Sequence, residues 1–300
     1  RYLEAKGLLF ESLWVTSQKS IGNPRLAILN KDDKSYGYMK RVATPNQISY
    51  SRINQADIWA DNIVNRTSEL YFDCHIDEHV YQVKSPMVGI YNVSNALAAL
   101  ATCILGLGVD PKSAVAALAT QNTVPGRMET IDLGQNFTAI VDFAHTPYAL
   151  EAALETARSL TDGKVIAVFG SAGLRDREKR RMMPIASIKG ADITILTAED
   201  PRTESLDDIL QDMAEAAVCV GGVEGKSFYR VPDRGDAIRK AIELAEPGDL
   251  VMSCGKGHEQ SMCFITTEYN WDDRTAMRAA LAEHLGINGP KMPWLPTSRR

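Results

Sequence analysis

Cysteine pairs at disulfide, redox or metal-binding spacing are missing from this 300-residue sequence. The five cysteines lie far apart and form no CxxC motif, which fits reduced thiols in a cytosolic protein, so we expect a cytoplasmic location. His75, His79 and His284 have no partners at metal-ligand spacing, and no Ser-His-Asp or cysteine-nucleophile pattern stands out. The cysteines are Cys74, Cys103, Cys219, Cys254 and Cys263.

A basic excess and a long apolar run are also absent. The net charge of −5 argues against binding to nucleic acid or to a membrane surface, because both favour basic proteins. The longest apolar run, residues 96–109, is too short to span a bilayer and contains two glycines, so we expect no membrane insertion. No signal peptide is visible, and a helical pattern starts directly at Arg1, so we expect the sequence to be incomplete at its N-terminus. We also expect a monomer.

Residues 1–125 predict a mixed α/β domain. Apolar residues recur at helical spacing over residues 1–15, whereas the segments between residues 57 and 84 resemble the short strands of a meander. The predicted helices are 1–15, 92–106 and 111–120, and the predicted strands are 24–30, 57–65, 68–74 and 79–84.

From residue 126 onward, strands alternate with helices. This alternation predicts an α/β fold with a Rossmann-like, doubly wound and mostly parallel sheet covered on both faces. The length fits about two domains, 1–125 and 126–300, with an extended tail at about 288–300. The predicted strands are 128–133, 137–142, 164–169, 192–197, 226–230 and 249–253, followed by a hairpin arm at 262–266. The predicted helices are 147–160, 177–189, 206–217, 233–245 and 272–285.

Polar residues follow four of these strands, at the edge where a doubly wound sheet collects its ligand site. In the first case, Asp142 and His145 end a β-rich run, and Thr146 and Pro147 then open a helix as N-cap and first residue. Many α/β proteins have such a corner without a ligand, so its neighbours decide whether it is a site.

The second polar segment is FGSAGLRD, residues 169–176. Its glycines allow a backbone to approach an anion closely, and Arg175 can bind a carboxylate or phosphate through two parallel hydrogen bonds. The glycine spacing is neither a GxGxxG fingerprint nor a P-loop, so a plain turn between strand and helix is an open alternative.

The third and fourth segments carry more ionisable groups. Glu199, Asp200 and Arg202 surround a proline and can present both signs of charge to a zwitterion, although a solvated turn with a local ion pair is an alternative. The GKGHE motif at 255–259 interleaves two glycines with three ionisable residues directly after a buried strand, which favours a functional site.

Three polar residues of the first domain are less informative by themselves. Lys6 lies in the first predicted helix, where a lysine is normally a solvated charge. Asn92 and Asn95 lie at the start of a helix, where asparagine is normally a cap.

Together these segments resemble the Mur ligase family, and within it the UDP-N-acetylmuramoyl-tripeptide synthetases. They occur in the family's order and at its spacing over nearly the whole chain. The matching segments are RYLEAKGLLF (1–10), YNVSNALAALA (91–101), VPGRME (124–129), VDFAHTP (141–147), FGSAGLRDREKR (169–180), EDPRTE (199–204) and GKGHE (255–259).

The resemblance implies an enzyme, an ATP-dependent amide ligase of peptidoglycan precursor synthesis. ATP would phosphorylate the terminal carboxylate of a UDP-N-acetylmuramoyl-dipeptide, and an incoming amino acid would attack the acyl phosphate. Mg²⁺ and positive groups would offset the charge on the transferring phosphoryl group, and the nucleophile would be held in line. The implied cofactors are ATP and Mg²⁺, and the implied partners are the UDP-linked dipeptide and a diamino acid.

The resemblance also implies roles in nucleotide and metal binding. Lys6 matches a lysine that is carbamylated in the family and then binds a magnesium ion. Asn92 and Asn95 match the asparagines beside the adenine, and Arg127 and Asp142 match groups on the phosphate and ribose. His145 lies in the same corner, so the implied catalytic residues are Lys6, Arg127 and His145.

The implied amino-acid site contains a departure from the family pattern. Arg175, Arg202, Gly255 and Glu259 match positions that hold the incoming amino acid in diaminopimelate-adding members, but Glu199 and Asp200 stand where those members carry Asp-Asn. Arg202 would suit a distal carboxylate, whereas the charge of Asp200 would suit a distal ammonium. Leu174 also replaces a common acidic residue. We expect a diamino acid, with diaminopimelate ahead of ornithine or lysine.

The second departure is that the family's phosphate-cradling loop, of the GTNGKT type, is absent from this sequence. Its place lies upstream of Arg1, as does the UDP-binding domain. We therefore interpret residues 1–125 as the last part of a central P-loop-type ATPase domain and 126–300 as the C-terminal domain, and we expect these 300 residues alone to be inactive.

Three alternatives stay open at this point. A folylpolyglutamate or cyanophycin synthetase would share the superfamily, but the EDPR and GKGHE pair argues against it. A non-catalytic nucleotide-binding module fits the missing loop, although the intact motif residues argue against decay. An NAD-dependent dehydrogenase would need a glycine fingerprint that this sequence lacks.

Overall fold

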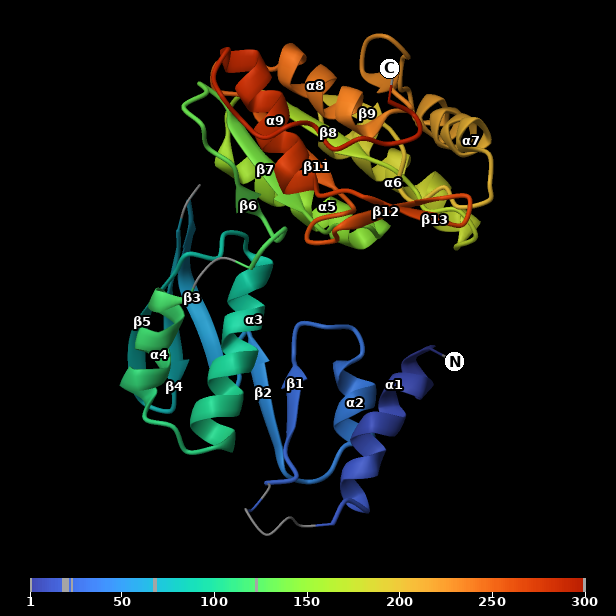
Figure 1. Ribbon diagram of the computed structural model, residues 1–300. Coiled ribbons are helices and arrows are strands. Elements are labelled where there is room, and N and C mark those ends of the chain that lie inside the picture. Colours follow the sequence, from blue (N-terminus) through green and yellow to red (C-terminus); the bar gives the residue numbers. More distant parts are fainter. Residues whose placement is uncertain (1, 18–21, 23, 67–68, 122–123, 299–300) are drawn as a thin grey trace. The chain divides into compact units, whose positions relative to one another are not determined.

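The computed structural model describes residues 2–17, 22, 24–66, 69–121 and 124–298 (Figure 1). The chain divides into two compact units, residues 1–122 (unit 1) and residues 123–300 (unit 2). Residues 1, 68, 299 and 300, which belong to elements predicted above, lie outside the described residues. Among the helices of the described part, none combines the length and the hydropathy of a membrane span.

Unit 1 is built on a five-stranded mixed sheet with the strand order β1-β2-β3-β4-β5. β1, β2 and β3 run parallel, and β3, β4 and β5 form an antiparallel meander. The strands are β1 (Ala27–Asn30), β2 (Gln47–Ser51), β3 (Ile58–Asn65), β4 (Leu70–Ile76) and β5 (His79–Ser85). The helices are α1 (Tyr2–Glu11), α2 (Tyr36–Val42), α3 (Tyr91–Leu100) and α4 (Pro111–Thr120), with a 3-10 turn η1 (Ser12–Trp14) after α1 and a π-helical segment η2 (Ala101–Gly106) after α3.

The core of unit 1 lies between the meander and α3. Residues of β4 alternate between buried and half-buried, as the two-residue period of a strand requires. Leu70 and Phe72 of β4 pack in one cluster with Val93 and Leu97 of α3. The meander is as predicted, and the predicted helix at 92–106 is present as α3 with η2.

The sequence-based prediction for unit 1 misses α2 and β2 and starts the first strand too early. Arg25 has a φ of 45°, which lies in the left-handed region outside strand geometry, so β1 begins only at Ala27. α2 has 7 residues and includes Gly37, so it is too short for a clear helical period. In β2 the first four residues are all half-buried, so the strand lacks the alternation that a pattern search needs.

Unit 2 contains a six-stranded sheet in the order β10-β9-β8-β11-β7-β6, parallel except for β6. This confirms the doubly wound, mostly parallel sheet. The strands are β6 (Glu129–Thr130), β7 (Thr138–Asp142), β8 (Val165–Phe169), β9 (Ile193–Leu196), β10 (Phe228–Arg230) and β11 (Leu250–Cys254), with a separate hairpin of β12 (Ser261–Phe264) and β13 (Thr267–Asn270). The helices are α5 (Pro147–Leu160), α6 (Arg177–Gly190), α7 (Leu206–Cys219), α8 (Arg234–Leu244) and α9 (Asp273–Leu285).

Helices cover both faces of this sheet (Figure 1). α8 and α9 pack together and share a buried cluster with the strands, which includes Val141, Val168 and Val251. α5, α6 and α7 pack side by side in the other layer. The start of α5 is as predicted, because the Thr146 hydroxyl accepts a hydrogen bond from the Ala149 amide at 3.2 Å and Pro147 is the first helical residue.

The C-terminal segment is more firmly bound than an extended tail. It contains no helix or strand up to residue 298, but Leu295 is fully buried in the cluster beneath α8 and α9. The hydroxyl groups of Thr297 and Ser298 each donate to Oδ2 of Asp233 at 2.8 Å. The described part of the predicted tail is therefore docked on unit 2.

Candidate functional site

Three of the predicted polar segments converge in unit 2. They follow β8, β9 and β11, and β8 lies between the other two strands, so their carboxyl ends share one edge of the sheet. Gly170 and Gly173 lie directly against the turn after β9, where an added Cβ would clash with Glu199 and with the carbonyl oxygen of Pro201. These glycines therefore allow the loop after β8 to contact the turn formed by residues 199–202 (the EDPR turn).

Glycines also bring the GKGHE segment against its neighbours. Gly255 has a φ of 111°, and a Cβ there would clash with Oε2 of Glu199. A Cβ on Gly257, with a φ of 50°, would lie 2.7 Å from Cβ of Phe143. The segment thus contacts the EDPR turn on one side and the Asp142 corner on the other, which only glycine permits at these two positions.

Lys256 is a site residue that the sequence-based prediction does not include. Its side chain is 2% exposed, and Nζ lies 3.0 Å from Oδ1 of Asp200 and 2.6 Å from Oε2 of Glu259. Burial alone would lower the pKa of Lys256, but the bonds to Glu259 and Asp200 outweigh it and raise that pKa. Lys256 therefore stays charged and holds two acids of the site together. The sequence signal that could have identified Lys256 as a site residue is its position inside the GKGHE motif.

Asp200 and Arg202 have unusual backbone conformations. Their φ angles are 41° and 54°, in the left-handed region that residues other than glycine, asparagine and aspartate rarely occupy, so Arg202 is the more unusual of the two. The backbone amide of Cys263 in β12 donates to Oδ1 of Asp200 at 2.9 Å, and the Arg202 amide donates to the Cys263 carbonyl at 3.1 Å. The β12–β13 hairpin thus holds the EDPR turn in this conformation.

One buried acceptor and one buried donor on this turn have no hydrogen-bond partner within the described part of the chain. The acceptor is Oε2 of Glu199, and the donor is Nε of Arg202. Burial raises the pKa of Glu199 to about 7, against the opposing effect of Arg234, Lys179 and Lys256. An acceptor and a donor left unpaired on one turn can receive a ligand that carries both an ammonium and a carboxylate.

A fully buried ion pair lies beneath these segments, and the sequence-based prediction misses it. Arg234 binds Asp273 through two hydrogen bonds of 2.7 Å, and both side chains are 0% exposed. Arg234 also donates to the carbonyl oxygens of Ala198 at 3.1 Å and Cys254 at 2.7 Å, the residues just before Glu199 and Gly255. The pair therefore ties the ends of β9 and β11 together.

The Asp142 corner lies at the end of β7, on the other side of the GKGHE segment from the EDPR turn. Asp142 is buried, and its carboxylate accepts from the amides of Met128 and Ala144, each at 2.8 Å. Burial raises the pKa of Asp142 above its usual value, although these two amide bonds oppose the rise. In this structure Asp142 thus anchors the VPGRM loop and its own corner.

Phe143 is the centre of that corner. The Arg127 guanidinium lies 4.5 Å from its ring centroid, and the rings of His145 and His258 lie at 4.4 and 4.8 Å. Nδ1 of His145 is 2.9 Å from the Phe143 carbonyl oxygen. The corner therefore offers an aromatic and cationic surface, and it includes His258, to which the GKGHE pattern alone gives no separate role.

Arg175 does not join the buried cluster. Its side chain is exposed in the loop after β8, and no carboxylate within the described part of the chain lies at ion-pair distance. Glu199, Asp200, Gly255 and Glu259 are brought together with Lys256, whereas Arg175 stays outside this group.

The predicted residues of unit 1 are arranged differently. Lys6 is exposed on α1, with Nζ 5.5 Å from the ring centroid of Tyr2. Asn92 is buried and donates to the Val88 carbonyl at 2.7 Å, and Asn95 donates to Oδ1 of Asn92 at 2.9 Å. Asn92 is therefore not the N-cap of α3, a position that Ile90 holds without a side-chain bond.

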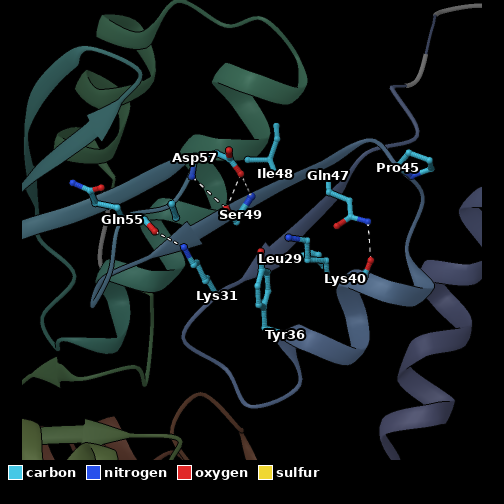
Figure 2. Close-up of a pocket in the computed structure, with 11 residues that line it drawn as sticks. Leu29, Lys31, Tyr36, Lys40, Pro45, Gln47, Ile48, Ser49, Gln55 and Asp57 are labelled. Atoms are coloured by element: carbon cyan, nitrogen blue, oxygen red, sulfur yellow. Dashed lines mark hydrogen bonds between the residues drawn. The ribbon is translucent and has the colours of Figure 1, made fainter.

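Unit 1 also contains a cavity of about 550 Å³ beside α2, lined by none of the predicted site residues (Figure 2). Lys31 reaches it from the end of β1 and Lys40 reaches it from α2. Nζ of Lys31 donates to the Gln55 carbonyl at 2.6 Å, and Nζ of Lys40 lies 5.8 Å from the ring centroid of Tyr36.

A parallel α/β unit with charged loops at the carboxyl ends of its strands is the architecture of many nucleotide-dependent enzymes. Comparison with known families makes the assignment specific. Residues 1–103 match the Mur ligase middle domain, and residues 126–257 match the Mur ligase glutamate ligase domain. The chain belongs to the Mur ligase family.

Two relatives illustrate the match. A UDP-N-acetylmuramoyl-L-alanyl-D-glutamate–2,6-diaminopimelate ligase from Geobacillus thermodenitrificans (strain NG80-2) is 39% identical over 282 residues, which cover 94% of this chain and 56% of the relative. A UDP-N-acetylmuramyl-tripeptide synthetase from Roseiflexus sp. (strain RS-1) is 38% identical over 293 residues, which cover 96% and 57%. The chain thus spans little more than half the length of these relatives.

Solved structures agree with this assignment. A structure of a UDP-N-acetylmuramoyl-L-alanyl-D-glutamate–2,6-diaminopimelate ligase matches with a TM-score of 0.59 and 32% identity, over 94% of this chain and 56% of that one. A UDP-N-acetylmuramate-alanine ligase from Thermotoga maritima matches with a TM-score of 0.61 at 17% identity, over 87% and 52%, which shows a shared fold only.

Proposed function

We propose that this chain acts in an ATP-dependent ligase that joins a diamino acid to UDP-N-acetylmuramoyl-L-alanyl-D-glutamate, with meso-diaminopimelate ahead of ornithine and lysine. One observation carries the choice of substrate: Oε2 of Glu199 and Nε of Arg202 are buried on one turn without a partner among the described residues. A buried group left unpaired costs about 1–3 kcal/mol, so a zwitterionic ligand that pairs both atoms would gain from each.

The distal end of diaminopimelate fits these groups. Its ammonium would bind Glu199 and Glu259, its carboxylate would bind Arg202, and Arg175 could bind the same carboxylate from the rim. Gly255 would let this end approach the backbone. At the other end, the free amine would attack the acyl carbon of the phosphorylated dipeptide: the C–N bond forms, the C–O bond to phosphate breaks, phosphate leaves with the electron pair and the amine releases a proton.

The corner after β7 supports a nucleotide subsite. Arg127 provides a cation that suits a phosphate, and the partly exposed rings of Phe143 and His145 provide an aromatic surface beside it. Asp142 would face the ribose only with the lone pairs that its two amide bonds leave free. In unit 1, Asn92 and Asn95 keep their proposed place beside the adenine.

The described residues do not by themselves fit a magnesium ion. Within the described part of the chain, no three acidic, histidine or cysteine side chains gather as a metal site. Lys6 is exposed, and a lysine ammonium cannot ligate a cation unless it is carbamylated. We therefore assign no step to the metal.

We assign residues 1–125 to the central ATPase domain and residues 126–300 to the C-terminal domain. We place the reaction in the cytoplasm, where ATP is available and where unpaired thiols such as the five free cysteines of this chain stay reduced. Both assignments rest on the family and on the composition.

The decisive experiment is a ligase assay on the full-length protein with ATP, the UDP-linked dipeptide and each of the three diamino acids. We expect phosphate release and product formation that depend on all three substrates, with the highest kcat/KM for meso-diaminopimelate. Glu199→Gln should raise the KM for the amino acid far more than the KM for ATP. A wild-type enzyme that prefers lysine or ornithine would contradict the choice of substrate, and one that releases no phosphate would contradict the reaction.

A further inference from the structure

Lys256 is a buried cation at the centre of the proposed amino-acid site, and the reaction described above gives it no task. Its ammonium lies between Oδ1 of Asp200 at 3.0 Å and Oε2 of Glu259 at 2.6 Å. A buried ammonium is retained only when its partners compensate the loss of water, and here both partners belong to the site itself.

The contacts of Lys256 determine how much uncompensated negative charge the EDPR turn presents to a ligand. Oδ1 of Asp200 accepts from Lys256 and from the Cys263 amide, so the charge of Asp200 is compensated within the protein. Glu259 shares the same ammonium but is 42% exposed, so its carboxylate stays open to a ligand. The acids left for a ligand are Glu199 and, in part, Glu259, and on the same turn Nε of Arg202 has no partner within the described part of the chain.

We propose that Lys256 is a specificity-determining residue, which neutralises Asp200 and thereby makes the site select an amino acid with a distal carboxylate beside its distal ammonium. Without Lys256, Asp200 and Glu259 would be uncompensated acids, and the site would favour an amino acid whose distal end is an ammonium alone. Lys256 does not touch the reacting atoms, so it acts through charge and through the position of Glu259. This proposal rests on the proposed function and names what selects its substrate.

Three variants test the proposal on the full-length enzyme, and the quantity measured is the ratio of kcat/KM for meso-diaminopimelate to kcat/KM for L-lysine. Lys256→Met should lower this ratio by about tenfold or more, because it exposes one or two uncompensated acids at contact distance. Asp200→Asn should raise the ratio severalfold, because it frees the Lys256 ammonium. Asparagine tolerates the left-handed conformation of residue 200, so the variant should fold.

The double variant Lys256→Met with Asp200→Asn removes both charges and should recover most of the wild-type ratio. Lys240→Met on α8 removes a partly exposed lysine and is the matched control, with an unchanged ratio. A purely structural role would lower both values of kcat/KM together and leave the ratio within about twofold, which would overturn the proposal. A double variant with the same ratio as Lys256→Met would overturn it as well.

Binding to the 300-residue chain separates this proposal from the proposed reaction. Calorimetric titration should give a higher affinity for meso-diaminopimelate than for L-lysine, and Lys256→Met should lower the ratio of the two affinities by about tenfold or more. If the full-length enzyme forms no product but the affinity ratio falls in this way, the reaction is wrong and the role of Lys256 stands. If neither amino acid binds, or if the affinity ratio stays within about twofold, the role of Lys256 is wrong.

Discussion

Lys256 in the candidate site of unit 2 and Arg234 beneath it are held in buried ion pairs, whereas Lys6 of the predicted site in unit 1 and Lys40 of its cavity are exposed. Lys256 and Arg234 are almost completely buried, and each contacts a carboxylate. Lys6 and Lys40 are exposed, and among the described residues neither lies at ion-pair distance from a carboxylate. A buried charge must be paired, so in unit 2 the geometry of the site and the stability of the fold depend on the same contacts. For the exposed Lys6 of unit 1, by contrast, we expect that function can be lost without a loss of stability.

The largest effect should follow from breaking the deepest pair of unit 2. Arg234→Met leaves Asp273 buried without its partner, and removal of one member of a buried pair costs about 3–5 kcal/mol. Burial would raise the pKa of Asp273, but the adjacent Arg234 outweighs it and lowers that pKa, which shows how strongly the two charges depend on each other. Urea unfolding, followed by tryptophan fluorescence, should report the loss, since Trp271 donates to Oδ1 of Asp273 at 2.7 Å.

The control for this prediction is Arg239→Met on the same helix. Arg239 pairs with Glu283 at 2.6 Å, but both side chains are partly exposed, so the loss should stay below about 1 kcal/mol. Equal losses for the two variants would mean that the burial of the Arg234 pair does not decide its contribution.

The next effect depends on pH and concerns Glu199. Its pKa is raised to about 7 in the folded state from an ordinary value of 4.5, so between these values the folded protein binds more protons than the unfolded chain. Stability from this group is therefore lost as the pH rises, by about 3 kcal/mol above pH 7. Glu199→Gln carries no charge, so it should be more stable than the wild type at pH 8, and the difference should shrink toward pH 4.5.

Urea unfolding at pH 4.5 and pH 8 measures this difference, and Glu283→Gln provides a control of opposite sign. The bond to Arg239 lowers the pKa of Glu283, so its contribution to stability is present above its ordinary pKa and is lost as the pH falls. Glu283→Gln should thus be less stable than the wild type at pH 8. A Glu199→Gln difference that is the same at both pH values would show that Glu199 does not titrate in this range.

The contrast between local sequence patterns and buried pairs of distant residues also explains which parts of the site the sequence could predict. Strand ends followed by glycines and charges are local patterns, so the segments around Asp142, Glu199 and Gly255 are recognisable from the sequence alone. The Arg234–Asp273 pair joins residues 39 positions apart, and each looks locally like a solvated charge at the start of a helix. Only the packing of α8 and α9 brings them together.

The same limit applies to parts of the fold. The parallel sheet of unit 2 follows from the alternation of buried strands and helices, whereas α2 and β2 of unit 1 are too short and too evenly half-buried to give a period. Docking of the C-terminal segment depends on Leu295, whose burial is a property of the space beneath α8 and α9 and not of its neighbours in the sequence.

The smallest effect on stability should come from a change at Lys6 in unit 1. This change tests most directly the comparison between exposed and buried cations in the two units. Lys6→Ala removes an exposed side chain whose described contact is the Tyr2 ring, so the free energy of unfolding should change by no more than about 0.5 kcal/mol. Ligase activity of the full-length enzyme should nevertheless fall by about a hundredfold or more if Lys6 serves the phosphoryl-transfer step, as the family resemblance implies. Lys112→Ala on α4, also exposed, should change neither quantity. A Lys6→Ala variant that loses stability along with activity would mean that Lys6, like Lys256 and Arg234, takes part in contacts that hold the fold together.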